Sequence, residues 1–398
     1  MLSKTDILSI IGRKKQLFTQ ELNSHREVIS NSISGARVLI IGAAGSIGSA
    51  TTIQLADFGP KQLHLLDINE NEMADLVRRL RVGEHLQQYT ELRSFIIDVN
   101  DPMFEVFCRD GRGYDFVFNL SAMKHVRSES NLYSLARLIE TNIISTIRII
   151  KYLSSSGPFK YFCVSTDKAA NPVNLMGMSK LVMENYAFSN EFGIPVSSAR
   201  FANVAFSSGS LLESFDRRIR ERRPLVIPQG IKRYFISEEE AGSICLLSCI
   251  IAPHRGILVP SENSGLQLIA FEHIVEAYLD VLGFSPEIFE AGSNSIPVPD
   301  PDGATWPVVL SAVDTTGEKP FEEFMGAGDA LVESSFRELS IILKDGCPPL
   351  MALGEFERRF FALRASAHAA KSDYVSLLTK TGATIDYADV GKYLDDKM

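Results

Sequence analysis

The chain has 398 residues, of which 45% are apolar and 22% charged, as in ordinary soluble globular proteins. A chain of this length can bury a large core in one large domain or in two unequal ones. Its net charge of −9 disfavours a nucleic-acid partner, and no apolar run approaches the roughly 20 residues that cross a bilayer, so we expect no integral membrane segment.

The N-terminal 34 residues predict helix, with apolar positions spaced to form a stripe that packs on a body or a partner. Charged residues interrupt this stretch, which therefore lacks the features of a secretory signal and predicts a cytoplasmic protein. The five cysteines include no Cys-x-x-Cys pair. The sequence therefore indicates neither a disulfide framework nor a thiolate zinc site, and we expect no metal.

From Ala36 onward, short apolar runs rich in β-branched and aromatic residues alternate with longer helical stretches. The runs are residues 38–41, 63–66, 95–97, 116–120, 161–164 and 196–201. Strands this apolar are typical of a parallel sheet that helices cover on both faces. A later helix (237–251) and strand (256–259) are expected to return to the same sheet.

A glycine-rich turn directly follows the first predicted strand. Gly42, Gly45 and Gly48 recur at three-residue intervals, and a helical pattern comes next. Glycine permits a tight turn and close backbone approach, and the N-terminus of the helix presents unpaired N–H groups to a pyrophosphate. The turn predicts a dinucleotide-binding loop, in which Ser46 and Ile47 also contact the cofactor.

Acidic residues end the second and third predicted strands. Asp67 lies 25 residues after Gly42, where a carboxylate accepts hydrogen bonds from an adenosine ribose and repels a 2′-phosphate, so NAD is preferred over NADP. The alternative is a glycine turn with a helix-capping aspartate. Asp98 and Val99 are expected to flank the adenine, with a turn-forming role as the alternative for Asp98.

These features predict an α/β fold: a doubly wound parallel Rossmann sheet with a second, smaller substrate-binding lobe. The expected parts are a helical N-terminal extension (1–34), a NAD-binding domain (35–206 and 236–260), the substrate-binding lobe (207–235 and 261–349) and a helical C-terminal extension (350–398).

Several motifs then occur in order along the chain. They are residues 119–126, 141–142, 165–172, 176–180, 200–204, 233–235 and 317–319. With the glycine loop, they resemble the extended short-chain dehydrogenase/reductase superfamily and, within it, the UDP-N-acetylglucosamine (UDP-GlcNAc) 4,6-dehydratases of bacterial polysaccharide and nonulosonic acid biosynthesis. The likeness covers about residues 35–323.

The resemblance implies a catalytic role for the pair Asp167–Lys168. In that family the cofactor takes hydride from sugar carbon 4, water leaves across carbons 5 and 6, and hydride returns to carbon 6. This chemistry needs an acid for the departing hydroxyl and a base for the carbon 5 proton. The resemblance implies Asp167 as the acid, which must carry a proton when it acts, and Lys168 as the base, which must be neutral.

Met176 departs from the superfamily pattern. It stands where the Tyr-x-x-x-Lys motif ending at Lys180 would place tyrosine, and a thioether cannot exchange the alcohol proton as a phenol does. One interpretation is an inactive site. The resemblance favours a dehydratase branch that carries Met, in which Thr166 or Asp167 helps to deprotonate the carbon 4 hydroxyl while Lys180 holds the nicotinamide ribose. That branch is associated with retention at carbon 5.

Further site residues rest on the resemblance and on side-chain chemistry. Ala122 and Lys124 follow the fourth predicted strand and are expected near the cofactor, with Lys124 also near the substrate. Asn142 is expected to shape the cofactor site, with a purely structural amide as the alternative. For the nucleotide sugar, where guanidinium groups pair with phosphates and carboxylates accept ribose hydroxyls, we predict Lys124, Asn203, Ser210, Arg233 and Glu318.

Two other functions remain open. A nucleotide-sugar 4-epimerase would keep the fold but lose no water; such enzymes lack the Asp167–Lys168 pair and normally need the tyrosine that is missing here. A non-catalytic NAD-binding protein would be supported by Met176. The apolar N-terminal helix and the superfamily's habit of pairing helices favour a homo-oligomer.

Overall fold

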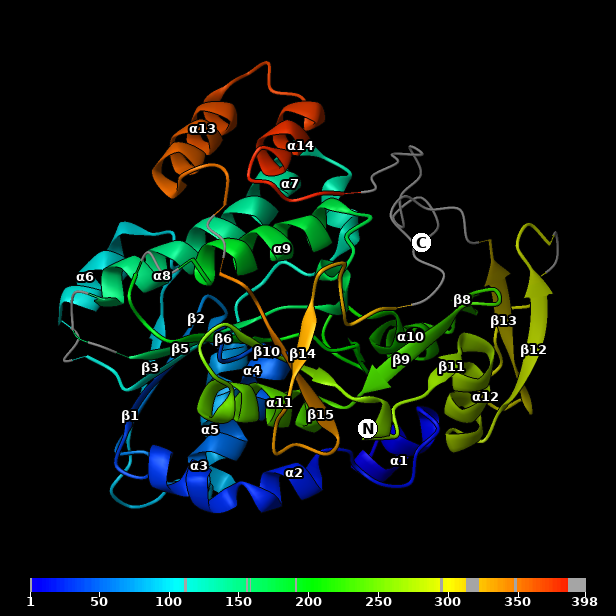
Figure 1. Ribbon diagram of the computed structural model, residues 1–398. Coiled ribbons are helices and arrows are strands. Elements are labelled where there is room, and N and C mark those ends of the chain that lie inside the picture. The colour runs from blue at the N-terminus through cyan, green and yellow to red at the C-terminus, as the bar shows by residue number, and fades with distance from the viewer. Residues whose placement is uncertain are drawn as a thin grey trace.

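One nine-stranded sheet forms the centre of the computed structural model, which describes residues 2–110, 113–154, 157, 159–189, 192–293, 296–312, 322–346 and 349–385 (Figure 1). The strand order is β14-β15-β10-β6-β5-β4-β1-β2-β3. The bounds are β1 (Arg37–Ile41), β2 (Gln62–Asp67), β3 (Glu91–Ile96), β4 (Phe116–Asn119), β5 (Lys160–Val164), β6 (Val196–Ala199), β10 (Gly256–Pro260), β14 (Ala330–Val332) and β15 (Leu339–Leu343).

Parallel pairing runs from β3 through β2, β1, β4, β5 and β6 to β10, and only β15 runs antiparallel to its neighbours β10 and β14. The doubly wound parallel sheet is thus confirmed. The strand order reverses between β1 and β4, and ligands bind at such switch points, beyond the carboxyl ends of the strands.

Helices cover both faces of the sheet (Figure 1). One face carries α6 (Pro102–Asp110), α7 (Leu132–Ile139), α8 (Ser145–Ser154) and α9 (Leu175–Ala187). The C-terminal helices α13 (Leu353–Ala365) and α14 (Lys371–Thr379) share that core, and α14 contacts α9. The other face carries α2 (Thr19–Ser24), α3 (Arg26–Ile33), α4 (Ser46–Ala56), α5 (Glu70–Val82) and α11 (Glu238–Ile251).

The edge strand β3 begins earlier than the sequence predicts. Its apolar run starts at Phe95, but the strand starts at Glu91 and consists of exposed and half-buried residues. A continuous apolar run is expected only where both faces of a strand are buried, and no residue of this edge strand is fully buried. The hydrophobic pattern therefore marks the central strands and misses the first half of this one.

The N-terminal extension is helical, as expected, but it forms three helices. α1 (Lys4–Ile10) packs on α12 (Phe271–Val281), while α2 and α3 pack on α11. Phe18 precedes α2 with a left-handed φ of 60°, which separates α1 from the later helices. The extension thus spans two hydrophobic cores.

Two small sheets and a third hydrophobic core lie beside the large sheet. The first sheet joins β7 (Asn203–Val204), β9 (Lys232–Ile236) and β11 (Leu268–Ala270). The second joins β8 (Leu225–Pro228), β12 (Ser285–Glu290) and β13 (Thr305–Ser311), and α10 (Leu211–Arg220) and α12 contribute to the same core. The division into a domain and a lobe stays a prediction, but residues 330–343, expected in the lobe, instead add β14 and β15 to the large sheet.

Within the described residues, we find no helix with the length and hydropathy needed to cross a membrane.

Candidate active site

The glycine loop joins β1 to α4 and leaves no room for side chains at two positions. Gly42 has φ +74°, and a Cβ there would lie 2.5 Å from the Ser121 nitrogen, while a Cβ on Gly48 would lie 2.0 Å from the Gly42 carbonyl oxygen. At Gly45 the nearest atom to a Cβ would be 3.6 Å away. Gly45 also precedes α4 without a side-chain cap, so the first N–H groups of the helix are available to an anion. This geometry fits a pyrophosphate.

Asp67 at the end of β2 braces the glycine loop. One carboxylate oxygen accepts a hydrogen bond from the Ala44 nitrogen at 2.9 Å, and the other accepts one from the Asn69 nitrogen at 3.0 Å. A carboxylate oxygen has two lone pairs, so each retains capacity for a ribose hydroxyl. The structure thus places Asp67 beside the loop. That this carboxylate makes the site prefer NAD over NADP stays a prediction.

Asp98, beyond the end of β3, is held within its own loop. Its Oδ1 accepts a hydrogen bond from the Asn100 nitrogen at 2.9 Å, and its Oδ2 accepts one from Arg137 Nη2 at 2.6 Å. Burial alone would raise the pKa of Asp98, but the hydrogen bonds from Asn100 and Arg137 lower it. The turn-forming role is therefore observed, with Val99 buried beside it, and the contact with adenine stays a prediction.

The predicted catalytic segment, residues 165–168, follows β5 and enters the short helix η3 (Asp167–Ala169). Thr166 Oγ1 donates a hydrogen bond to Asp167 Oδ1 at 2.6 Å. Lys168 Nζ lies 3.2 and 3.3 Å from the two oxygens of the same carboxylate. Asp167 is 2% exposed, so one buried carboxylate joins a hydroxyl and an ammonium group at the carboxyl end of the central strands.

Met176 and Lys180 lie on the buried face of α9. The Met176 nitrogen donates to Glu129 Oε1 at 2.7 Å, and its thioether side chain is buried. Lys180 Nζ donates to the Val164 carbonyl at 2.9 Å, directly before the catalytic segment. Burial lowers the pKa of Lys180 to about 8, although nearby Cys163 and Glu184 oppose this change. The lysine is thus placed at the end of β5.

Asn142 lies in a single π-helical turn, η2 (Glu140–Ile144), between α7 and α8. Its Oδ1 accepts from the Met123 nitrogen and its Nδ2 donates to the Met123 carbonyl, both at 3.0 Å. Its Nδ2 also donates to Ser179 Oγ on α9 at 2.9 Å. The amide therefore clamps the loop after β4, in which Ala122 is exposed, to α9. This is the structural alternative, and direct contact with the cofactor stays a prediction.

The segment before α10 contacts two predicted cofactor-binding residues. Lys124 Nζ donates to Ser207 Oγ at 3.1 Å, and Ser46 Oγ accepts from the Ser208 nitrogen at 3.1 Å. Ser210 uses its hydroxyl to cap α10, accepting from the Glu213 nitrogen at 3.2 Å. The segment of Ser207 and Ser208 thus contacts both the loop after β4 and the start of α4. Ile47, next to Ser46, is half-buried.

A carboxylate that the sequence analysis missed joins two predicted substrate-binding residues. Glu322 Oε1 accepts a hydrogen bond from Asn203 Nδ2 and lies 3.8 Å from Arg233 Nε. Its Oε2 accepts from the Tyr234 nitrogen at 2.8 Å. Asn203 and Arg233 are therefore brought together, whereas the predicted Glu318 lies outside the described residues.

Glu322 also interacts electrostatically with the predicted catalytic pair, Asp167 and Lys168. Burial and, after it, the negative charge of Asp167 raise its pKa from 4.5 to about 7, although Lys168 and Arg233 act in the opposite direction. The sequence analysis marked the motif at residues 317–319 and selected Glu318. That motif gave no reason to select Glu322, three residues beyond it.

A buried ion network fixes the segment that carries Glu322. Arg200 is fully buried and contacts Glu184 on α9 and Asp329, each at 2.6 Å. The Gly326 nitrogen donates to Asp329 Oδ2 at 2.8 Å, and Asn171, near the catalytic pair, donates to Glu323 at 3.1 Å. These contacts hold residues 322–329 against β6, α9 and the catalytic segment.

Comparison with known proteins identifies the family. Residues 38–342 match the family described as polysaccharide biosynthesis protein. The chain belongs to this family. The match covers the Rossmann sheet, the catalytic segment and both small sheets, and it confirms the resemblance that the sequence motifs carry.

The polysaccharide biosynthesis chain has several curated relatives. An uncharacterized membrane protein of Methanocaldococcus jannaschii is 31% identical over 66% of this chain and 77% of its own length. The probable polysaccharide biosynthesis protein EpsC of Bacillus subtilis is 28% identical over 79% of this chain, which spans only 49% of that relative. A UDP-N-acetylglucosamine 4,6-dehydratase (inverting) of Campylobacter jejuni is 30% identical over 58% of this chain and 68% of the relative.

Solved structures share the fold. Pen from Bacillus thuringiensis superposes with a TM-score of 0.63 at 21% identity, covering 80% of this chain and 90% of Pen. WbmF of Bordetella bronchiseptica, in complex with NAD⁺ and UDP, gives a TM-score of 0.51 at 16% identity, covering 68% and 81% of the two chains. At these identities, the likeness establishes the architecture of this polysaccharide biosynthesis chain.

Proposed function

We propose that this chain catalyses the NAD-dependent 4,6-dehydration of UDP-GlcNAc to a UDP-4-keto-6-deoxy-N-acetylhexosamine, for surface-glycan or nonulosonic acid biosynthesis. One observation carries the proposal: Thr166, Asp167 and Lys168 form a contiguous hydrogen-bonded group at the sheet edge that also bears the glycine loop. The related Campylobacter dehydratase supports the reaction, and the WbmF complex supports the cofactor and the UDP moiety.

The glycine loop, Asp67 and Lys180 are the residues that would hold the dinucleotide. When bound, its nicotinamide supplies a hydride acceptor for sugar carbon 4 and returns hydride to carbon 6. The absence of side chains at Gly42 and Gly48 lets the loop close, and the space at Gly45 lets a phosphate reach the N-terminus of α4. Lys180, fixed at the end of β5, is suited to a ribose hydroxyl.

A single proton can serve both ends of the reaction. Asp167 would take the proton of the carbon 4 hydroxyl through Thr166, whose own hydroxyl already donates to the carboxylate at 2.6 Å. Asp167 would then give that proton to the carbon 6 hydroxyl, which leaves as water. This path replaces the missing tyrosine, because the acid needed at carbon 6 is produced by the base needed at carbon 4.

Lys168 would remove the proton from carbon 5 and return it after hydride reaches carbon 6. It must be neutral when it acts. Because Asp167 is the acceptor of the carbon 4 proton, Lys168 must have released its own proton to solvent beforehand. If Lys168 returns the proton from the side on which it took it, the configuration at carbon 5 is retained.

The nucleotide would lie against the small sheets. Arg233 and Asn203, held together by Glu322, would meet phosphate and ribose, and Lys124, which contacts Ser207, would also lie near the substrate. We keep the cytoplasmic location and the homo-oligomeric state as predictions of the sequence.

The test is incubation of the purified protein with UDP-GlcNAc and NAD, followed by mass spectrometry. Loss of one water supports the proposal, and NMR of the product formed in deuterated water then distinguishes retention from inversion at carbon 5. The control is Asp167→Asn, which should bind NAD normally and form no product.

Two other outcomes would replace the proposal. Conversion to the 4-epimer without change in mass would indicate an epimerase, the activity named for a Rickettsia canadensis relative that is 26% identical over 275 residues. NAD binding with no product from any UDP-hexosamine would indicate a non-catalytic protein.

A further inference from the structure

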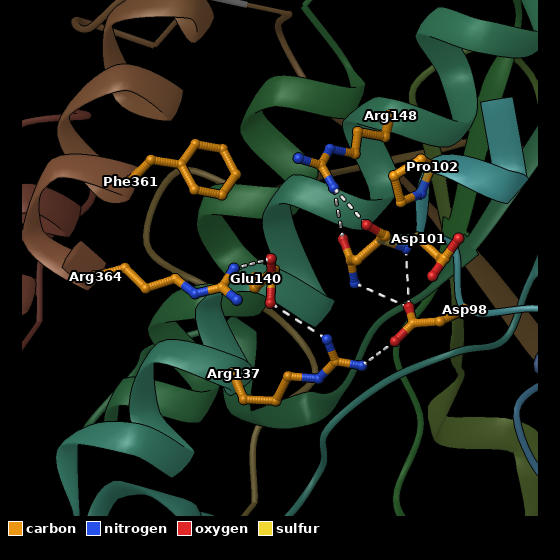
Figure 2. Close-up of a pocket in the computed structure, with 9 residues that line it drawn as sticks. Asp98, Asp101, Pro102, Arg137, Glu140, Arg148, Phe361 and Arg364 are labelled. Carbon is orange, nitrogen blue, oxygen red and sulfur yellow. Dashed lines mark hydrogen bonds and ion pairs between the residues drawn. The ribbon is translucent and has the colours of Figure 1, made fainter.

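A hollow of about 280 Å³ lies where the C-terminal helices meet the loop after β3 (Figure 2). Phe361 and Arg364 of α13 form one wall. The remaining lining residues come from the β3–α6 connection and from α7, η2 and α8: Asp98, Asn100, Asp101, Pro102, Arg137, Glu140 and Arg148. Helix α13, beyond residue 350, and the loop after β3, which is part of the predicted cofactor site, thus line the same hollow.

Three ion pairs in series cross this hollow, as Figure 2 shows. Arg364 Nη1 donates to Glu140 Oε1, Arg137 Nη1 lies 3.2 Å from Glu140 Oε2, and Arg137 Nη2 lies 2.6 Å from Asp98 Oδ2. The side chain of Glu140 is 4% exposed, whereas those of Arg137 and Arg364 are 40% and 49% exposed. A buried carboxylate therefore divides its two oxygens between two guanidinium groups.

Glu140 is also the first residue of the π-helical turn that carries Asn142. Ser145 Oγ donates to the Glu140 carbonyl at 3.1 Å and closes this turn. Two residues beyond Glu140, Asn142 clamps both backbone groups of Met123. Such turns are frequent at functional sites. The position of Glu140 therefore bears on the loop after β4 through Asn142 and on the loop after β3 through Arg137.

We propose that Arg364 is a positioning residue for the cofactor site: through Glu140 and Arg137, it fixes the loops after β3 and β4 against the adenosine half of the dinucleotide. This inference rests on the cofactor assigned in the proposed function. Its physical basis is that Glu140 and Asp98 compete for the guanidinium group of Arg137. Without Arg364, the buried Glu140 would draw Arg137 into a bidentate pair, and the loop of Asp98 would lose its guanidinium partner.

The alternative is that Arg364 merely fastens α13 to the body of the protein. The burial of α13 argues against this, because Phe356 and Phe360 are fully buried and already anchor the helix. Replacement of the half-exposed Arg364 should therefore barely change the melting temperature. A change in cofactor affinity without a matching change in stability separates positioning from simple fastening.

The experiment measures NAD binding by isothermal titration calorimetry for the full chain and three variants. Arg364→Ala should weaken NAD binding by about five- to tenfold, in the range of other networks that couple distant residues. Arg364→Lys, which keeps the charge, should recover part of the affinity. Arg359→Ala is the matched control on the same helix, because Arg359 pairs with half-buried Glu355 one turn earlier, and it should bind like the wild type.

Equal NAD affinities for the Arg364→Ala and Arg359→Ala variants would overturn the inference. So would weaker binding that merely parallels a fall in melting temperature. If the wild type bound no NAD, both proposals would fail together. If it bound NAD but dehydrated no nucleotide sugar, the reaction would fail while the effect of Arg364 could still be measured and would support the inference.

Discussion

Replacing Glu322 by glutamine should remove a specific pH dependence of stability. Burial raises the pKa of this carboxyl from 4.5 to about 7. Between those values the folded protein binds a proton that the unfolded chain has released. The stabilisation is therefore complete below pH 4.5 and is lost as the pH rises through 7. At about 1.4 kcal/mol per pKa unit, the loss across this window is roughly 3 kcal/mol.

Urea unfolding of the wild type and of Glu322→Gln from pH 4.5 to 8.5 would measure this effect, followed by the fluorescence of the single tryptophan, Trp306. The difference between the two proteins isolates Glu322, because all other titrating groups are shared. The wild type should lose roughly 3 kcal/mol relative to the variant as the pH rises. Glu323→Gln is the control, since that neighbouring side chain accepts a hydrogen bond from Asn171. Parallel pH profiles for the wild type and Glu322→Gln would refute the assignment.

Three further predictions concern catalysis, cofactor binding and stability. Asp167→Asn should lower kcat at least about 100-fold with NAD binding retained; near-normal turnover would contradict its role as the acid. Gly48→Ala should abolish NAD binding in calorimetry, because the added Cβ would lie 2.0 Å from a loop carbonyl. Arg200→Met should cost about 3–5 kcal/mol in urea unfolding, since it removes the guanidinium that pairs with buried Glu184, while Asp329 keeps Lys344; a cost below about 1 kcal/mol would contradict this role of Arg200.

The sequence predicted the parts of the fold that depend on local pattern. The run before Gly42 and the carboxylate of Asp67 could be found because strand, turn and helix are contiguous. The predicted β3 was too short, because this edge strand consists of exposed and half-buried residues and lacks a continuous apolar pattern. The short strands β14 and β15 were assigned to the lobe, because pairing with β10 depends on a contact between segments far apart in the chain.

The candidate site was predicted in the same uneven way. Thr166, Asp167 and Lys168 are consecutive, so their contacts follow from one backbone turn. Glu322 reaches them from a distant segment, and its orientation depends on the buried ion network of Arg200. Arg364 lies in a stretch whose pattern predicts only helix. Hydrophobic periodicity identifies the face that a helix buries, but it does not show which charged side chain at the rim meets a carboxylate from another element.

The geometry around Asp167 also bears on the choice between dehydration and epimerisation. An epimerase must return the proton to the carbon 4 oxygen when the ketone is reduced, so one tyrosine can take and return it. In a dehydration the carbonyl remains at carbon 4. The proton of the original carbon 4 hydroxyl is therefore not needed there again, and it can leave with the carbon 6 oxygen as part of the water. In the proposed reaction, the hydroxyl of Thr166 and the buried carboxylate of Asp167 would form the path for that one-way transfer, while Met176 has no proton to exchange. The absence of the phenol is therefore compatible with loss of water and removes the group on which epimerisation normally depends.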